Sequence, residues 1–110
     1  MNVGTKLGRK PLLWIATASV LIGFSVRAED ASPAQRGKET FALYCASCHG
    51  EGASGGFGPA LTNLAGRKDK REVEAIIRQP ASPMPPLYPA TINDGDVTDI
   101  VAYLQSLQGH

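Results

Sequence analysis

The sequence predicts an all-α fold of three to four helices. Three segments, at residues 32–45, 69–79 and 93–107, each begin with a helix-capping residue and continue with apolar residues at helical spacing. No alternation of polar and apolar residues runs beyond a few positions, so no segment indicates a β-strand. A chain of 110 residues is long enough for one domain.

The first 28 residues have the layout of a secretory signal. An apolar run over residues 12–24 follows three basic residues, which are Lys6, Arg9 and Lys10. Small residues at Val26 and Ala28 then stand where a signal peptidase reads, so we expect cleavage after Ala28 and a domain of residues 29–110. The apolar run is shorter than the roughly 20 residues that span a bilayer. Stable membrane insertion is therefore not expected, and a retained anchor is the alternative.

Charge and size limit what the exported domain can be. Without residues 1–28 it has seven Lys and Arg residues against ten Asp and Glu residues, a net charge of −3. Nucleic acid is not an expected partner, because its binding needs clustered basic charge. A domain this small buries a modest core. Its two cysteines are three positions apart, so no long-range disulfide supports the fold, and a bound group is expected to fill the centre.

The first expected helix begins at Ser32, with Pro33 at the first helical position and Gln35 completing a capping box. One stripe of this helix leads into the cysteine pair and consists of Gly37, Phe41, Tyr44 and Cys45. We expect the two aromatic residues to pack in the core. A glycine inside a helix costs about 1 kcal/mol relative to alanine. Gly37 therefore indicates that another helix approaches closely there.

Cys45, Cys48 and His49 form a C-x-x-C-H motif, the spacing of a c-type haem attachment site. Two thiols three positions apart can each add to one of the two vinyl groups on a porphyrin edge. The adjacent histidine then lies below the ring, where an imidazole nitrogen can bind the iron. We predict one haem c, attached through Cys45 and Cys48, with His49 as an axial iron ligand.

Residues 50–58 follow, and five of these nine are glycine. Such a segment forms neither a helix nor a good strand. A flexible linker is hard to justify inside a small domain, whereas a loop folded around a flat ligand suits it. Pro59 has no N–H and offers its carbonyl oxygen, which can accept a hydrogen bond from His49.

The second expected helix begins at Asp69, with Glu72 completing a capping box, and ends at Gln79 before Pro80. Its apolar face consists of Val73, Ile76 and Ile77. The basic residues at its start are Arg67, Lys68, Lys70 and Arg71. We interpret them as a solvated helix start, and a docking patch for an acidic partner is the alternative.

Residues 80–89 contain five prolines, which exclude a helix or a central strand. Met84 lies among them and is the only methionine left once the signal is removed. A methionine that fills core space normally lies on a helix or strand, not between Pro83 and Pro85. Flanking prolines restrict the backbone, which helps to hold a thioether against a metal. We therefore predict Met84 as the second axial ligand of the haem iron.

The last expected helix begins at Asn93, with Asp94 and Asp96 in its first turn, where the helix dipole favours negative charge. Its apolar residues recur at intervals of three and four and are Val97, Ile100, Val101, Leu104 and Leu107. Tyr103 adds an aromatic side chain at the flank of this face.

Taken together, the chain resembles the class I monohaem c-type cytochromes over residues 33–108. The resemblance rests on the two terminal helices and on Cys45, Cys48, His49, Gly58, Pro59, Leu61 and Met84. It implies the cytochrome c fold, with three to four helices packed around one covalently bound haem. It also implies that the N- and C-terminal helices cross, with Gly37 and Phe41 against Ile100 and Tyr103.

The resemblance also implies roles around the haem. The Pro59 carbonyl would orient the His49 imidazole, and Arg67 and Asn63 look similar to residues that steady the haem propionates or the ligand loop. Residues 84–90 look like the ligand loop of cytochrome subunits that serve periplasmic dehydrogenases. His49 with Met84 would leave the iron six-coordinate, with no open position for a substrate.

The expected function is therefore a periplasmic one-electron carrier that is not an enzyme and has no small-molecule substrate. Its expected partners are redox proteins, with a dehydrogenase as donor and an oxidase or another cytochrome as acceptor. One alternative is a cytochrome subunit fixed in a dehydrogenase complex. Another is a haem enzyme or sensor with a labile sixth ligand, with His110 as a variant ligand. A haem-free protein would be a thiol oxidoreductase, which calls for strands around the motif, or a zinc site, which needs four ligands.

Overall fold

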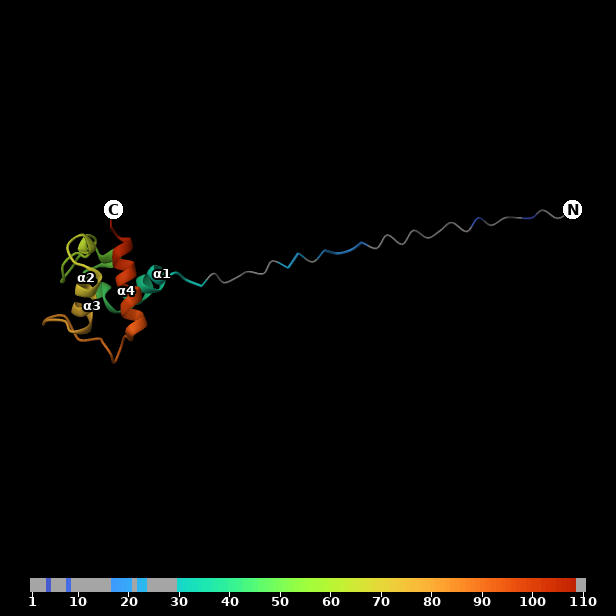
Figure 1. The fold of residues 1–110 in the computed structure, drawn as a ribbon. Coiled ribbons are helices and arrows are strands. Elements are labelled where there is room, and N and C mark those ends of the chain that lie inside the picture. The colour runs from blue at the N-terminus through green and yellow to red at the C-terminus, as the bar shows by residue number, and fades with distance from the viewer. Residues whose placement is uncertain (1–3, 5–7, 9–16, 21, 24–29, 109–110) are drawn as a thin grey trace.

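The computed structural model describes residues 4, 8, 17–20, 22–23 and 30–108, and its secondary structure, within residues 33–106, is helical (Figure 1). The described residues contain no strand. The elements are α1 (Pro33–Tyr44), α2 (Ala46–His49), the 3-10 turns η1 (Glu51–Ala53) and η2 (Leu64–Gly66), α3 (Lys70–Arg78) and α4 (Asp94–Ser106). The all-α prediction of three to four helices is confirmed. Most of the expected export signal, residues 1–28, and His110 lie outside the described residues, so their roles stay predictions.

The three longer helices begin at the predicted capping boxes. The Asp69 side chain accepts a hydrogen bond of 2.9 Å from the Glu72 N–H, and the Glu72 carboxylate accepts one from the Asp69 N–H. The same reciprocal pair starts the other two, with Ser32 and Gln35 at α1 and Asn93 and Asp96 at α4. Each such cap contributes on the order of 1 kcal/mol. The helix starts are therefore set by residues three positions apart.

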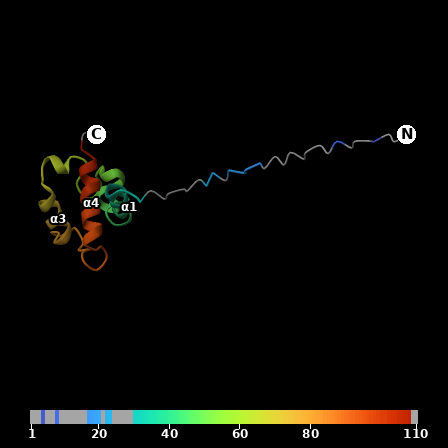
Figure 2. The same cartoon turned by 45° about the vertical axis from the view of Figure 1, so that its right-hand side comes forward.

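Helices α1 and α4 cross at Gly37, and the two lie side by side in both views (Figures 1 and 2). A Cβ atom on Gly37 would lie 1.9 Å from the carbonyl oxygen of Asp99, so only glycine permits this approach. One turn further along, the Phe41 and Tyr103 rings pack with centroids 5.4 Å apart and planes tilted by 59°. The predicted crossing of the first and last helices is confirmed.

An ion pair on the surface joins the same two helices. Arg36 Nε lies 2.8 Å from Asp99 Oδ2, and Arg36 Nη2 lies 3.1 Å from Asp99 Oδ1. The guanidinium also donates to the Ala31 carbonyl, which fastens the chain just before α1. Because half of the Arg36 side chain is exposed, water screens this pair, and it adds less to stability than the buried crossing does.

The core lies between α4 and the other helices. Its buried members are Phe41, Ala53, Val73, Ile77, Ile92, Val97, Ile100, Val101, Tyr103 and Leu104. No helix in the described part of the chain combines the length and the apolar character that crossing a membrane requires.

Tyr44, expected in the core, and Ile76, expected on the apolar face of its helix, are both partly exposed. Tyr44 is 41% exposed and Ile76 is 39% exposed. Tyr44 lies in the last turn of α1, about 60° around the helix from Phe41, at the edge of the face that meets α4. Ile76 lies about 100° from Ile77, and Val73 and Ile77 take the inward positions of α3. The core prediction for Tyr44 was wrong, and only Val73 and Ile77 of the expected apolar face of α3 are buried, because the buried stripe of each helix is narrower than its apolar spacing suggested.

Candidate functional site

The imidazole of His49 is held by the carbonyl of Pro59. His49 is the last residue of α2, and its Nδ1 atom lies 2.9 Å from the Pro59 carbonyl oxygen. A carbonyl oxygen only accepts hydrogen bonds, so Nδ1 must carry the proton. The lone pair of the neutral ring is then on Nε2, which is the atom left to bind a metal. The predicted hydrogen bond is present.

The glycine-rich segment is folded tightly against α2. The Gly58 N–H donates to the Cys48 carbonyl at 2.7 Å, and the Gly55 N–H donates to the His49 carbonyl at 2.6 Å. A Cβ atom on Gly58 would lie 3.0 Å from Cε1 and Nδ1 of the His49 ring, and one on Gly56 would lie 3.0 Å from the Cys48 carbonyl oxygen. Glycine is needed there because backbone and ring approach each other closely. The segment is a fixed turn under the imidazole, not a linker.

Cys45 is the capping residue just before α2, and Cys48 lies within the helix. The Cys45 carbonyl accepts from the N–H groups of Cys48 and His49, at 3.2 and 2.9 Å, so the motif is one helical turn. Both thiols are half-buried and no disulfide joins them. Burial, and to a lesser degree the neighbouring Cys48, raises the pKa of Cys45 to about 11. This thiol is protonated at neutral pH, unlike the low-pKa thiolate of a thiol oxidoreductase.

Phe41 links the helix crossing to this turn. Its ring packs on Tyr103 at the crossing, and its centroid lies 6.5 Å from that of the His49 imidazole. The Cys45 N–H also donates to the Phe41 carbonyl at 2.8 Å. The position of the motif is therefore set by the contact of α1 with α4.

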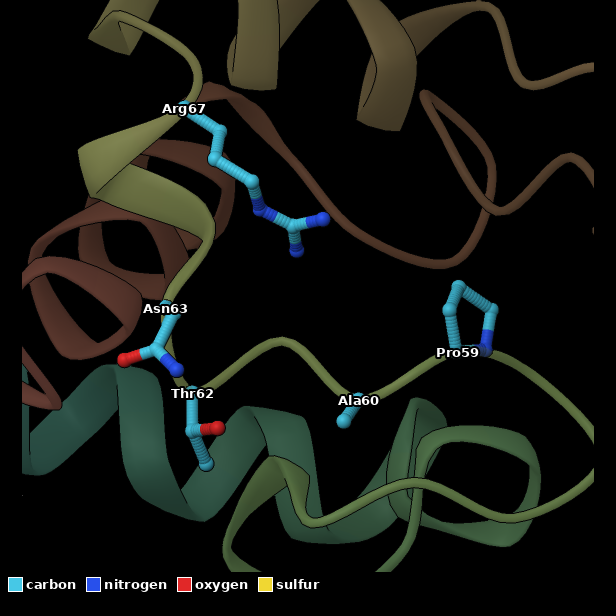
Figure 3. Close-up of a pocket in the computed structure, with 5 residues that line it drawn as sticks. All are labelled: Pro59, Ala60, Thr62, Asn63 and Arg67. Carbon is cyan, nitrogen blue, oxygen red and sulfur yellow. The ribbon is translucent and has the colours of Figure 1, made fainter.

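An open pocket of about 510 Å³ lies next to Pro59, whose carbonyl holds the His49 ring (Figure 3). It is lined by Pro59, Ala60, Thr62, Asn63 and Arg67. The Arg67 side chain extends from the end of η2 into the open space that faces Pro59 (Figure 3). The structure thus brings Pro59, Asn63 and Arg67 to one opening. A guanidinium there can form paired hydrogen bonds with a carboxylate of a bound group.

Met84 lies in the segment of residues 79–93 between α3 and α4. Its side chain is half-buried, and its N–H donates to the Ala81 carbonyl at 3.1 Å. The neighbouring Ser82–Pro83 peptide bond is cis, as is Tyr88–Pro89. The segment is the irregular, proline-rich connection that was predicted. The role of Met84 as an iron ligand stays a prediction.

One cluster that includes a residue of the 79–93 segment was missed. The Tyr88 hydroxyl donates to Asp94 Oδ1 at 2.8 Å, Arg78 forms an ion pair with the same carboxylate, and the Arg78 guanidinium carbon lies 4.6 Å from the centre of the Tyr88 ring. From the sequence, Asp94 is predicted only as a helix-start residue, and Arg78 and Tyr88 have no predicted role. No local pattern joins them, because they come from three separate segments.

The comparison with protein families decides the class of this chain. Residues 32–104 match the family of "Cytochrome C oxidase, cbb3-type, subunit III". The chain belongs to this family of c-type cytochromes.

Relatives and solved structures agree with that assignment. This cytochrome is 31% identical over 106 residues to the cbb3-type cytochrome c oxidase subunit FixP of Rhizobium etli, which covers 91% of this chain and 37% of FixP. It thus spans little more than a third of that relative. It is 32% identical over 75 residues to a cytochrome c-553-like protein of Synechocystis, covering 67% of this chain and 69% of the relative. Cytochrome cL of Methylophaga aminisulfidivorans superposes with a TM-score of 0.56 at 29% identity, covering 71% of this chain and 57% of that one.

Covalently attached haem c, with its iron, is the cofactor of this cytochrome. The residues of the site fit that group. Two unpaired thiols lie on one turn with an imidazole whose Nε2 is free, and an arginine reaches into the adjoining pocket. The described residues contain no group of three His, Cys, Asp or Glu side chains that could hold a metal ion by themselves. One imidazole beside two thiols fits a haem, whose porphyrin would supply four of the iron ligands.

Proposed function

We propose that this cytochrome is a one-electron carrier with one haem, bound through Cys45 and Cys48 and ligated at the iron by His49 and Met84. The observation that carries the proposal is the 2.9 Å contact between His49 Nδ1 and the Pro59 carbonyl oxygen. It fixes the tautomer of the ring and makes Nε2 a more basic ligand. A histidine held in this way is prepared for an iron before the iron binds.

The haem supplies the redox chemistry, and the protein supplies geometry and environment. A thioether ligand favours ferrous iron and raises the reduction potential relative to other ligand sets. With His49 and Met84 both bound, no coordination position is open. The proposal is therefore an electron carrier and not an enzyme, with no small-molecule substrate.

The lining of the open pocket would place a positive charge next to the haem. Arg67 provides a cation at the opening beside Pro59, where it would pair with a haem propionate, and Asn63 would add a hydrogen bond. Both residues are exposed, so water screens this charge and the contribution is modest.

Partners and location follow from the class of protein. We propose that the chain is exported through residues 1–28 to the periplasm, and that it exchanges electrons with redox proteins at a small, transient interface. The proposed donor is a dehydrogenase, because residues 84–90 resemble the ligand loop of cytochromes that serve such enzymes. The proposed acceptor is an oxidase or another cytochrome.

A second candidate is a fixed subunit of an electron-transfer complex. The observation that favours it is the match over 91% of this chain to part of FixP, a relative that is named as an oxidase subunit. Purification of the exported protein, with no other protein tagged, distinguishes the free carrier from the fixed subunit. A free carrier elutes alone, whereas a subunit elutes with other chains.

The ligand assignment is tested on the purified exported protein by absorption spectroscopy. The ferric wild type should show the weak red band of an iron–methionine sulfur bond, and Met84→Ala should lose it and become high-spin. Cys48→Ser should leave one thioether bond and shift the pyridine haemochrome maximum, while Ser47→Ala, between the cysteines, should leave it unchanged. A high-spin wild type that reacts readily with peroxide would instead indicate a haem enzyme or sensor.

A further inference from the structure

Three segments meet at the base of the loop of residues 79–93, which we call the Met84 loop, at the end where α3 stops and α4 begins (Figure 1). Arg78 is the last residue of α3, Asp94 is the first residue of α4, and Tyr88 lies between them in the loop. We call these three residues the loop clamp. Asp94 Oδ1 accepts from the Tyr88 hydroxyl and pairs with Arg78, whose guanidinium lies over the Tyr88 ring at 4.6 Å.

Each member of the loop clamp contacts both of the others. The ion pair alone would contribute little to folding, because three quarters of the Asp94 side chain is exposed and the pair is screened. The arrangement nevertheless restricts the tyrosine in two directions at once. Its hydroxyl is bound to α4 through Asp94, and its ring face is covered by the end of α3 through Arg78. The contacts therefore fix the position of the Tyr88 side chain more than they stabilise the folded protein.

The half of the loop next to Tyr88 is well anchored. The N–H groups of Thr91 and Ile92 donate to the Leu87 carbonyl at 2.7 and 3.1 Å. The Ile92 side chain is 1% exposed, and Leu87 and Tyr88 pack against the core. This half provides a fixed base for the residues that precede it.

Met84 is connected to that base through two prolines. Pro85 and Pro86 stand between it and Leu87, and each proline ring fixes its backbone φ angle near −65°. A stiff connection transmits a displacement of Leu87 and Tyr88 to Met84 instead of absorbing it. On the other side, the N–H of Met84 is bound only three residues away, to the Ala81 carbonyl, within the same loop.

We propose that Arg78, Tyr88 and Asp94 are positioning residues that hold the Met84 loop so that the thioether stays at the iron. This inference rests on the proposed function, because it requires Met84 to be an axial ligand. Tyr88 is the central member, since it alone belongs to the loop. Loosening it gives the Met84 sulfur more positions away from the iron, and the bond to sulfur is more easily replaced.

Imidazole is a suitable probe of this bond. It competes with Met84 for the ferric iron, so its apparent affinity for the purified holoprotein increases when the thioether is held less firmly. Tyr88→Phe keeps the ring beside Arg78 and removes only the hydrogen bond to Asp94. We expect it to increase the imidazole affinity roughly threefold to tenfold, the scale of one partly exposed hydrogen bond to a charged group.

Asp94→Asn and Arg78→Lys test the other members. Asparagine still accepts from Tyr88 but loses the charge, and lysine keeps the charge but loses the flat guanidinium over the ring. Each should increase the imidazole affinity. The double variant of Tyr88→Phe and Asp94→Asn should show less than the product of the single effects, because both changes weaken the same contact.

Asp99→Asn is the matched control. It breaks the ion pair with Arg36, which joins α1 to α4 at the surface and contacts no residue of the loop clamp. We expect its denaturation midpoint to fall while its imidazole affinity stays within about twofold of the wild type. If the imidazole affinity of Asp99→Asn rose as much as that of Tyr88→Phe, the proposal would be overturned, because the affinity would then follow the general stability of the protein.

The proposal would also be overturned if Tyr88→Phe and Arg78→Lys both bound imidazole as the wild type does. A failure of the underlying ligand assignment has a different signature. In that case wild type and Met84→Ala would bind imidazole equally well, and the wild type would lack the red iron–sulfur band. The two hypotheses are thus separated by the same titration.

Discussion

The His49 imidazole packs against Gly58 and is oriented by Pro59, whose carbonyl oxygen lies 2.9 Å from Nδ1. The Gly58 backbone is itself fixed, because its N–H donates to the Cys48 carbonyl inside the motif. The turn that orients the His49 ring is therefore held in place by the motif to which His49 itself belongs. This arrangement leads to a prediction about the iron ligand.

Gly58→Ala should tilt the imidazole. The new Cβ atom would lie 3.0 Å from Cε1 and Nδ1 of the ring, so the ring must shift and its hydrogen bond to Pro59 weakens. A weaker hydrogen bond makes His49 a less basic ligand, which stabilises ferric iron less. We expect the reduction potential to rise in a redox titration. Gly66→Ala, whose Cβ meets nothing closer than 3.9 Å, is the control and should leave the potential unchanged.

Gly37→Ala should destabilise the whole domain. Its Cβ atom would lie 1.9 Å from the Asp99 carbonyl oxygen, so α1 and α4 must move apart. Overpacking of this kind costs roughly 1–3 kcal/mol or more in the free energy of unfolding. Urea denaturation of the holoprotein measures it, again beside Gly66→Ala. Equal stability of the two variants would mean that the crossing is looser than described.

Arg67→Gln should lower the reduction potential. The guanidinium extends into the pocket beside Pro59, and a nearby cation favours the reduced haem, which carries one positive charge less. The shift should be small and should shrink in high salt, because Arg67 is exposed. Lys68→Gln removes the same charge one residue away, outside the pocket lining. If both variants shift the potential equally, Arg67 acts only through the overall charge of the protein.

Asp94→Asn should remove an acid-sensitive part of the stability. Hydrogen bonds from Arg78 and then Tyr88 hold the pKa of Asp94 below its ordinary value. A lowered pKa stabilises the folded state above the ordinary aspartate pKa of about 3.9, and this contribution is lost as the pH falls from there through the lowered value. Because the pair is exposed and screened, we expect only a small difference in denaturation midpoint between wild type and variant at neutral pH, and convergence in acid. A difference independent of pH would contradict the ionised contact.

Much of the helical framework could be predicted, because its signals are local. A capping box joins residues three positions apart, so Asp69 with Glu72 and Asn93 with Asp96 marked the starts of α3 and α4 directly. The burial of each helix was harder to predict. Tyr44 and Ile76 have the spacing of core residues, yet both are exposed, since the width of a buried stripe depends on the partner helix.

The sequence by itself determined the chemistry: two thiols and an imidazole on one helical turn, a proline carbonyl ten residues on, and a single methionine between prolines. These features depend on residue type and short spacing, which can be read without knowing the tertiary structure. Only the tertiary structure decided that Arg78, Tyr88 and Asp94 meet at the base of the Met84 loop. Their contacts form when α3 and α4 pack side by side, and no property of the three residues taken singly encodes that meeting.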